Sequence, residues 1–165
     1  MAEAENRFAR SATELLTPEQ LAKLSGFAFI DGIRTGRFPA PPIAEPMGMR
    51  LIDVEPGRVV FEGRPAFAHY NPLGAVHGGW FGTLLDSCMA CAVQSALPAG
   101  QGYTTLEYSV KILRAVTEAT GALRAEGHTL RVGRRTGTAE GRLVDADGKL
   151  YATGSTTCLV FALSP

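Results

Sequence analysis

Residues 78–97 read GGWFGTLLDSCMACAVQSAL, and this stretch decides how the remainder of the 165-residue chain must fold. Almost every position around a helix built from it is small or apolar, which is typical of a helix buried on most sides. The stretch is long enough to raise the question of a membrane span. Because Asp86 lies near its middle and small residues dominate, we interpret it as a buried helix of a soluble protein.

Strand-like segments lie on both sides of this helix in the sequence. Before it, residues 49–54 and 58–62 flank a Glu-Pro-Gly turn and predict a hairpin. After it, a turn at residues 145–148 separates the last two of four predicted strands. These four strands are residues 103–113, 121–128, 134–144 and 150–161. Strands joined by short turns pair antiparallel, so we predict an α+β domain with one antiparallel β-sheet wrapped around the long central helix.

The sequence before this domain predicts a helical N-terminal extension. Residues 17–20 (TPEQ) carry the signals of a helix start, and apolar residues at helical spacing continue the pattern to about Ile33. Residues 38–42 (FPAPP) cannot continue a helix and predict a stiff linker. We therefore divide the chain into an extension with a Pro-rich linker, residues 1–45, and a domain comprising residues 46–165.

Composition and charge argue against several classes of protein. The chain has 16 basic and 16 acidic residues, and this zero formal charge argues against a nucleic-acid partner. The N-terminus lacks the features of a signal peptide, and three cysteines cannot form a disulfide framework. We therefore expect a cytoplasmic protein that binds neither nucleic acid nor a membrane.

Asp86 is the only charged residue of the central helix. A buried carboxylate is costly unless it is hydrogen-bonded, paired with a cation or placed in a cavity. One interpretation is structural, with Asp86 capping a neighbouring loop or pairing with an arginine such as Arg114. The other is a functional carboxylate whose pKa is raised by desolvation, and the residues before the helix favour this second interpretation.

The loop before the helix, residues 71–79, ends in two glycines at the predicted helix start. The first N–H groups of a helix lack intrahelical partners and can bind a developing oxyanion, while glycine lets a ligand approach closely. Asn71 and His77 can add side-chain donors to such a site. A turn residue before Pro72 and a helix-capping histidine are the simpler interpretations of these two residues.

The spacing of these groups predicts where a shared site lies. Gly79 and Asp86 are seven residues apart on one helix, so about 10 Å separates them. Reacting groups must come within about 3–3.5 Å of each other, so one carbonyl carbon cannot readily touch both. If both act in one reaction, the helix start and the carboxylate belong to different chains, and we expect a site at a two-fold dimer interface.

One sequence motif runs through the loop and the helix. It reads N-x-x-G-x-x-H-G-G followed by L-L-D and spans residues 71–86. On this motif, and on the strands at residues 103–114 and 132–135, the chain resembles hotdog-fold acyl-CoA thioesterases of the phenylacetate-degradation (PaaI-like) type. The resemblance covers roughly residues 47–161. It implies the hotdog fold, hydrolysis of an acyl-CoA to a free acid and CoA without a cofactor, and a homodimer or homotetramer.

The resemblance also implies a role for each candidate catalytic residue. Asp86 would be the general base or the nucleophile, and the Gly78 N–H would polarise the thioester carbonyl. Asn71 and His77 would help to place that carbonyl or the leaving sulfur, and Thr105 would orient the water. In the family the oxyanion donors and the carboxylate come from opposite subunits, which agrees with the distance argument above.

A second group of residues is a candidate for binding the substrate and its CoA moiety. Its members are Gly79, Gly133, Arg134 and Arg135. The planar guanidinium of arginine suits phosphate recognition, so the two arginines would contact the CoA phosphates. A solvated strand end is an equally good interpretation of this basic cluster.

Two local alternatives are left open by the sequence. Thr104 or Thr105 can supply the hydroxyl, because strand alternation puts only one of the two on the site face. Cys88 and Cys91 have C-x-x-C spacing, but a zinc site needs two further ligands and no second pair exists. We interpret them as two buried small hydrophobic residues and expect no metal.

Two other functions compete with the thioesterase. A non-catalytic acyl-CoA sensor or binding module would use the same cleft but would not need Asp86. A hotdog-fold hydratase or dehydratase would place a catalytic histidine in a different local motif. The sequence therefore favours an acyl-CoA thioesterase.

Overall fold

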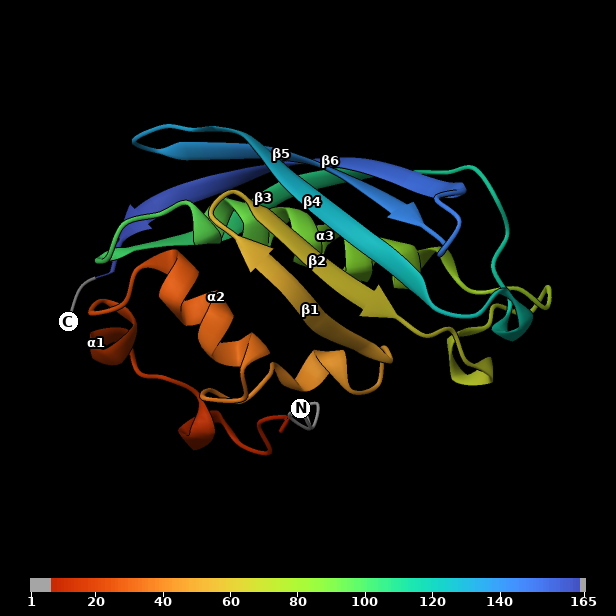
Figure 1. Ribbon diagram of the computed structural model, residues 1–165, viewed down its shortest axis with the longest axis horizontal. Helices are drawn as coiled ribbons and strands as arrows, with labels where there is room; N and C mark the ends of the chain where they lie inside the picture. The colour runs from red at the N-terminus through yellow and green to blue at the C-terminus, as the bar shows by residue number, and fades with distance from the viewer. Residues whose placement is uncertain (1–6, 164–165) are drawn as a thin grey trace.

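The computed structural model describes residues 7–163 as one curved sheet, one long helix and a helical extension (Figure 1). The helices are α1 (Pro18–Leu21), α2 (Gly26–Arg34) and α3 (Gly78–Ser95). The strands are β1 (Met49–Glu55), β2 (Arg58–Gly63), β3 (Gln101–Ile112), β4 (Leu123–Val132), β5 (Thr136–Val144) and β6 (Leu150–Ala162). The ends of the predicted extension and domain, residues 1–6 and 164–165, lie outside the described residues.

The six strands form one antiparallel sheet in the order β1-β2-β4-β5-β6-β3. Figure 1 shows this sheet curving over α3, which lies along its concave side. The α+β prediction and the hotdog arrangement are therefore confirmed. The strand boundaries differ by a few residues, since β4 continues to Val132 and β5 begins only at Thr136.

α3 lies close to the sheet because glycines face it. A Cβ on Gly127 would overlap the backbone carbonyl of Cys88, and a Cβ on Gly141 would lie 2.8 Å from Cγ of Met89. Leu85 and Met89 are completely buried in the core between helix and sheet. Among the helices of residues 7–163, none is long and apolar enough to cross a membrane.

β3 forms one edge of the sheet and contains a bulge. Its pairing with β6 shifts between Thr105 and Glu107, so Leu106 is an extra residue. Thr105 faces α3 before the bulge, and Tyr108 and Ile112 face it afterwards. β6 is the only strand paired with β3 in the described sheet, so the outer edge of β3 presents unpaired backbone groups. Exposed large apolar side chains gather on this strand and just after it: Leu106, Tyr108, Ile112 and Leu113.

The extension contains two short helices, so the prediction of one helix reaching Ile33 was wrong. The capping box of Thr17 and Gln20 is present, but α1 ends after four residues. The side chain of Ser25 then caps a separate helix, α2. Apolar residues keep their helical spacing across the break, and this spacing concealed the second cap.

α2 is docked on the C-terminal end of α3, as Figure 1 shows. The Gly26 N–H donates a hydrogen bond of 3.0 Å to the Leu97 carbonyl. A Cβ on Gly26 would overlap the Gln94 carbonyl, so this approach requires glycine. Ile30 of α2 is 2% exposed and belongs to the main hydrophobic cluster. The extension therefore shares the core of the domain on which it lies.

Candidate active site

Asp86 lies in the middle of α3 on the side that faces β3, and its side chain is half-buried. The Thr105 hydroxyl donates a hydrogen bond of 3.0 Å to Asp86 Oδ1. Thr104 is exposed and, by strand alternation, points to the other face. Burial raises the pKa of Asp86 above its usual value, and the hydrogen bond from Thr105 opposes this rise.

No described lysine or arginine pairs with Asp86 to offset its desolvation. Arg114, the partner that a structural interpretation predicts, instead donates from Nε to the Leu150 carbonyl at 3.0 Å. It lines a hollow at the N-terminal end of α3. The predicted pairing with Arg114 is therefore wrong, and Asp86 is a carboxylate held in a partly apolar setting without a counter-charge.

The thiols near Asp86 are poor nucleophiles. Burial raises the pKa of Cys88 well above its usual value and that of Cys91 to about 12, so both stay protonated at neutral pH. The nearby charge of Asp86 also contributes to the raised pKa of the Cys91 thiol and of the Tyr103 hydroxyl. Tyr103 was not predicted as a neighbour of the site, although its spacing of two residues from Thr105 on one strand signals it.

The N-terminus of α3 presents one unpaired backbone donor. Nδ1 of His77 accepts a hydrogen bond of 2.9 Å from the Gly79 N–H, and the His77 carbonyl accepts one of 3.0 Å from the Trp80 N–H. The N–H of Gly78, the first residue of the helix, has no acceptor in residues 7–163. His77 is thus a helix cap, and Gly78 rather than Gly79 carries the free N–H.

Asn71 shapes the loop that leads into this helix. Its side-chain oxygen accepts a hydrogen bond of 2.9 Å from the Leu73 N–H, as in an Asx turn. The side-chain amide N–H groups find no acceptor among the described residues. Asn71 and Gly78 line one hollow of about 350 Å³ together with Ile112 and Arg114. The structure therefore brings two predicted oxyanion donors to the same place.

α3 and β3 run side by side in opposite directions, and a helix residue faces a strand side chain at each step. Three such steps are Gly78–Ile112, Gly82–Tyr108 and Asp86–Thr105. Gly78 and Asp86 are eight residues apart on an unbroken helix, a rise of about 12 Å. The free donor and the carboxylate of one chain are therefore too far apart to touch the same carbonyl group.

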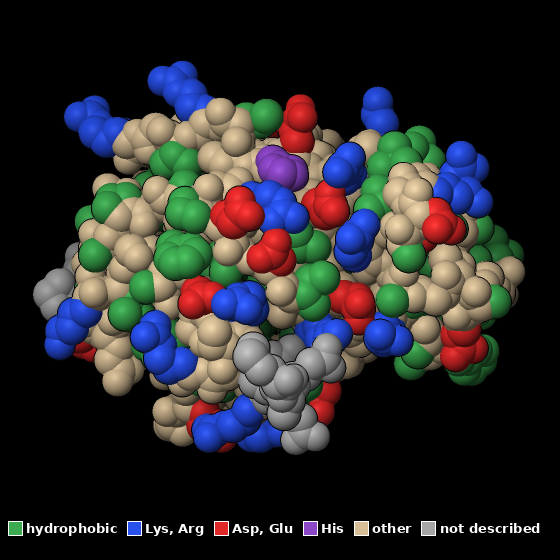
Figure 2. Space-filling view, viewed as in Figure 1, with side chains coloured by type: hydrophobic (Ala, Val, Ile, Leu, Met, Phe, Trp, Pro, Cys, Tyr) green, Lys and Arg blue, Asp and Glu red, His purple; other side chains and the backbone are tan. Residues whose placement is uncertain are grey.

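The structure does not bring the predicted CoA contacts to Asp86. Gly133, Arg134 and Arg135 lie at the turn between β4 and β5, where the Gly133 N–H donates 2.7 Å to the Thr136 carbonyl. Both arginines are exposed. Figure 2 shows basic side chains projecting into solvent over this turn.

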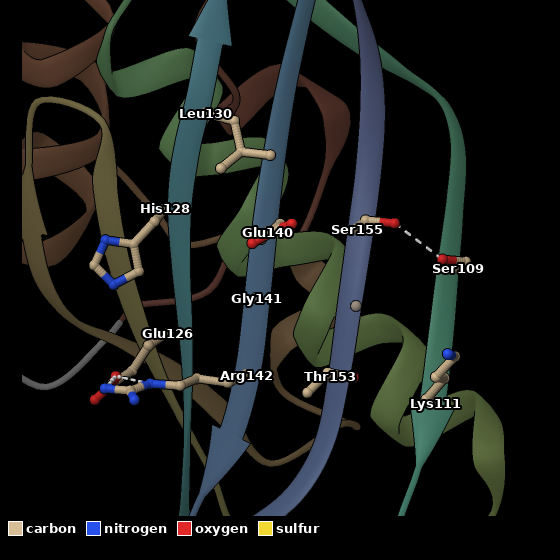
Figure 3. Close-up of a pocket in the computed structure, with 11 residues that line it drawn as sticks. Ser109, Lys111, Glu126, His128, Leu130, Glu140, Gly141, Arg142, Thr153 and Ser155 are labelled. Atoms are coloured by element: carbon tan, nitrogen blue, oxygen red, sulfur yellow. Dashed lines mark hydrogen bonds and ion pairs between the residues drawn. The ribbon is translucent and has the colours of Figure 1, made fainter.

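A separate hollow of about 730 Å³ lies on the outer face of the sheet (Figure 3). It is polar, with a hydrogen bond of 3.0 Å between Ser109 and Ser155 and one of 2.8 Å from Arg142 Nε to Glu126. None of the predicted site residues lines it. The candidate site is instead on the α3 side of the sheet.

A sheet wrapped around one long helix defines a hotdog fold, and here the helix carries a single, partly desolvated carboxylate. The family model of the Thioesterase superfamily matches residues 73–152. A phenylacetic acid degradation-related protein from Ralstonia eutropha JMP134 is 30% identical with a TM-score of 0.70, over 82% of this chain and 99% of that chain. The chain therefore belongs to the thioesterase superfamily, in its PaaI-like type.

Two further solved structures share the fold. A point mutant of the phenylacetic acid degradation protein PaaI from Thermus thermophilus is 27% identical with a TM-score of 0.64, over 72% of this chain and 97% of that chain. The PaaI protein of E. coli is 21% identical with a TM-score of 0.67, over 74% and 86%. No curated protein sequence matches the chain. The resemblance stated from the sequence motif is confirmed, and membership of the superfamily supports a hydrolase.

Proposed function

We propose that the protein is an acyl-CoA thioesterase whose site is shared by two copies of the chain. The observation that carries this proposal is the pair of groups on α3, a desolvated carboxylate at Asp86 and an unpaired N–H at Gly78. A thioester is already an activated acyl group, so a base and oxyanion donors suffice, and we propose a reaction without a metal or other cofactor.

Asp86 acts on the attacking water in this proposal. Thr105 binds Oδ1, and Oδ2 has no partner among the described residues, so Oδ2 can take a proton from water. The water oxygen then adds to the thioester carbon, the carbon–sulfur bond breaks, and the sulfur of CoA leaves with the proton. Direct attack by Asp86, giving a mixed anhydride that water hydrolyses, is the second route open to this geometry.

The N-terminal end of α3 stabilises the negative charge that develops on the carbonyl oxygen. The Gly78 N–H is the main donor, because neighbouring N–H groups are already bound. The side-chain amide of Asn71 and the ring of His77 help to place the carbonyl or the leaving sulfur. Losing one donor of this kind typically costs about 2.7–4 kcal/mol of transition-state stabilisation.

The shared site requires a two-fold dimer built through β3. Gly82 lies halfway between Gly78 and Asp86 on α3, and Tyr108 of β3 faces it. A two-fold axis at this level exchanges the two ends of α3 and brings the partner's Gly78 beside Asp86. Support comes from the open edge of β3 and its exposed apolar side chains, both of which such pairing would cover. The homotetramer implied by the resemblance stays a prediction.

We propose that Arg134 and Arg135, beside Gly133, contact the CoA phosphates, and that Gly79 leaves room for the substrate. Replacing either arginine by alanine is then expected to raise KM for acyl-CoA several-fold with little change in kcat, because only binding is affected. Steady-state kinetics at low salt measure this effect. An unchanged KM in both variants removes these arginines from the site.

Release of free thiol from a panel of acyl-CoA substrates tests the function. The wild type is compared with Asp86→Asn, which keeps an acceptor for Thr105 but removes the base. We expect kcat to fall by at least about 10²-fold while substrate binding is retained. Glu140→Gln makes the same chemical change on the outer face of the sheet and serves as the matched control.

Each other outcome has a defined meaning. Hydrolysis by Asp86→Asn at the wild-type rate contradicts the proposed role of the carboxylate. Binding of acyl-CoA by the wild type without any release of CoA replaces the thioesterase with a non-catalytic acyl-CoA-binding module.

A further inference from the structure

The extension and the hotdog domain enclose a cavity of about 320 Å³. Both parts of the chain supply its walls, and the residues that matter here are Leu16, Leu21, Phe29, Ile33, Cys91 and Tyr103. No charged side chain lines it, and its only polar side-chain groups are the thiol and the phenol that the domain contributes. The cavity therefore suits an uncharged, apolar ligand.

The floor of this cavity lies one step along α3 and β3 from the candidate active site. Tyr103 precedes Thr105 by two residues on the same face of β3, a distance of about 7 Å along the strand. Cys91 follows Asp86 by five residues on α3, a rise of about 7.5 Å. The cavity floor thus begins about 7 Å along these two elements from Asp86 and Thr105, a span that a few carbon–carbon bonds of an acyl chain would cover.

The polar groups of the cavity floor are neutral. Burial raises the pKa of the Cys91 thiol to about 12 and raises that of Tyr103 well above its usual value. Both side chains are therefore uncharged at neutral pH and offer no charge to a ligand. A carboxylate or phosphate would find no counter-charge there and would pay for its desolvation.

The wall supplied by the extension is fixed in place. The hydrogen bond from Gly26 to Leu97 and the burial of Ile30 hold α2 against α3. Within the extension itself, the Ala9 N–H donates a hydrogen bond of 3.0 Å to the Ala40 carbonyl. The superfamily match begins only at residue 73, so this wall lies outside the matched region.

We propose that this cavity is the acyl-binding pocket and that the extension selects the acyl group. The inference rests on the proposed thioesterase function and adds a substrate class, which is apolar acyl groups of medium length or with a phenyl ring. A water-sized group occupies about 30 Å³, so 320 Å³ has room for roughly ten non-hydrogen atoms. Acetyl and other very short acyl groups would leave most of the pocket empty.

Substitutions of Leu16 test the pocket in the full-length protein. Leu16 is only half-buried, so Leu16→Trp fills the cavity and Leu16→Ala widens it without opening the main core. The readout is kcat/KM for acetyl-, octanoyl-, dodecanoyl- and phenylacetyl-CoA. Leu16→Trp is expected to lower the ratio of octanoyl- to acetyl-CoA hydrolysis by about tenfold or more, and Leu16→Ala to favour dodecanoyl-CoA.

Leu24 offers a matched control, because it is a half-buried leucine of the same extension that does not line the cavity. Leu24→Trp and Leu24→Ala are expected to leave the ranking of the four substrates unchanged. Comparing kcat/KM for octanoyl-CoA with that for phenylacetyl-CoA shows whether the pocket prefers a linear or an aromatic acyl group. If the wild type releases CoA but Leu16 and Leu24 variants rank the substrates alike, the pocket proposal is overturned and the thioesterase stands.

Failure of the thioesterase itself gives a different result. If the wild type releases CoA from none of the four substrates, calorimetric titration with 1-octanol, an uncharged apolar probe, tests the cavity alone. Binding that weakens about tenfold or more in Leu16→Trp, but not in Leu24→Trp, supports the pocket. Equal binding by all three proteins, or no binding by the wild type, overturns it.

Discussion

The two halves of α3 are built in opposite ways. At its N-terminal end Gly78 and Gly79 are exposed, the adjoining hollow is open, and one backbone donor has no partner in the described chain. From Asp86 onward the helix is covered by β3 and by the docked extension, and Asp86 Oδ1 accepts a hydrogen bond from Thr105 of the same chain. This difference fits the proposed dimer, in which each copy would keep its carboxylate half within its own fold and present its donor half to the other copy.

Removing the free N–H at Gly78 is expected to have the largest effect on kcat. Gly78 is the first residue of α3, a position that tolerates proline, and His77 already has the extended backbone that proline requires before it. Gly78→Pro is therefore expected to keep the fold, lose the N–H and lower kcat by about 10²–10³-fold. Steady-state kinetics measure the loss.

Gly78→Ala is the control for the added bulk. It keeps the N–H, and its Cβ would lie 3.5 Å from Ile112 Cδ1, an ordinary contact. Equal rates in the alanine and proline variants would show that the backbone donor has no part in catalysis.

Mixing two inactive variants tests whether the carboxylate and the backbone donor of one site come from different chains. In a mixed dimer of Asp86→Asn and Gly78→Pro, one site carries both changes and the other carries neither. If subunits exchange at random, about a quarter of the wild-type activity is expected to return. Activity that stays at the level of the separate variants after verified exchange would place both groups in one chain.

The hydroxyl beside Asp86 is expected to set the acid side of the pH profile. The hydrogen bond from Thr105 lowers the pKa of Asp86, so Thr105→Val is expected to raise this pKa further. The ionised carboxylate is the active form, so the acid limb of kcat/KM then moves to higher pH. Thr104→Val, on the exposed face, leaves the limb in place, and a shift of equal size in both variants contradicts the assignment.

The smallest expected effect is a gain in stability. The pKa of Asp86 is raised in the folded state, so the ionised side chain disfavours folding above that pKa, and the penalty disappears below the unfolded value near about 3.9. Asp86→Asn is therefore expected to raise Tm at pH 7 by a few degrees, about 2–4 °C for each kcal/mol gained. Differential scanning calorimetry at pH 7 and about pH 3 checks this, and a lower Tm at pH 7 contradicts it.

The parts of the fold that were predictable are those set by local pattern. The long apolar helix and the alternating strands are visible because each period repeats over many residues. The break between α1 and α2 was missed, although Ser25 before Gly26 is a cap signal, because apolar spacing continues across it. The bulge at Leu106 has no local signature and depends on the pairing of β3 with β6.

The candidate site likewise has features that local sequence predicts and features that depend on the folded structure. Asp86 stands out in the sequence as a lone charge, and the glycines after His77 stand out as a helix start. Among the described residues, the Gly79 N–H is bound and the Gly78 N–H is free because of the conformation of the His77 side chain, which the sequence does not reveal. The cavity is lined jointly by Leu16 and by residues more than seventy positions later in the chain, an arrangement that no local pattern predicts.

The extra residue at Leu106 changes which side chains of β3 face the central helix. Before it, odd-numbered side chains such as Thr105 face α3, and after it even-numbered ones such as Tyr108 do. Deleting or inserting one residue nearby would turn a whole half of the strand to the other face of the sheet. Either the hydroxyl would leave Asp86 or the proposed dimer surface would be lost. A change of one residue in the length of this strand is therefore expected to damage the proposed site as much as loss of the carboxylate, whereas a substitution within one half leaves the facing of the other half intact.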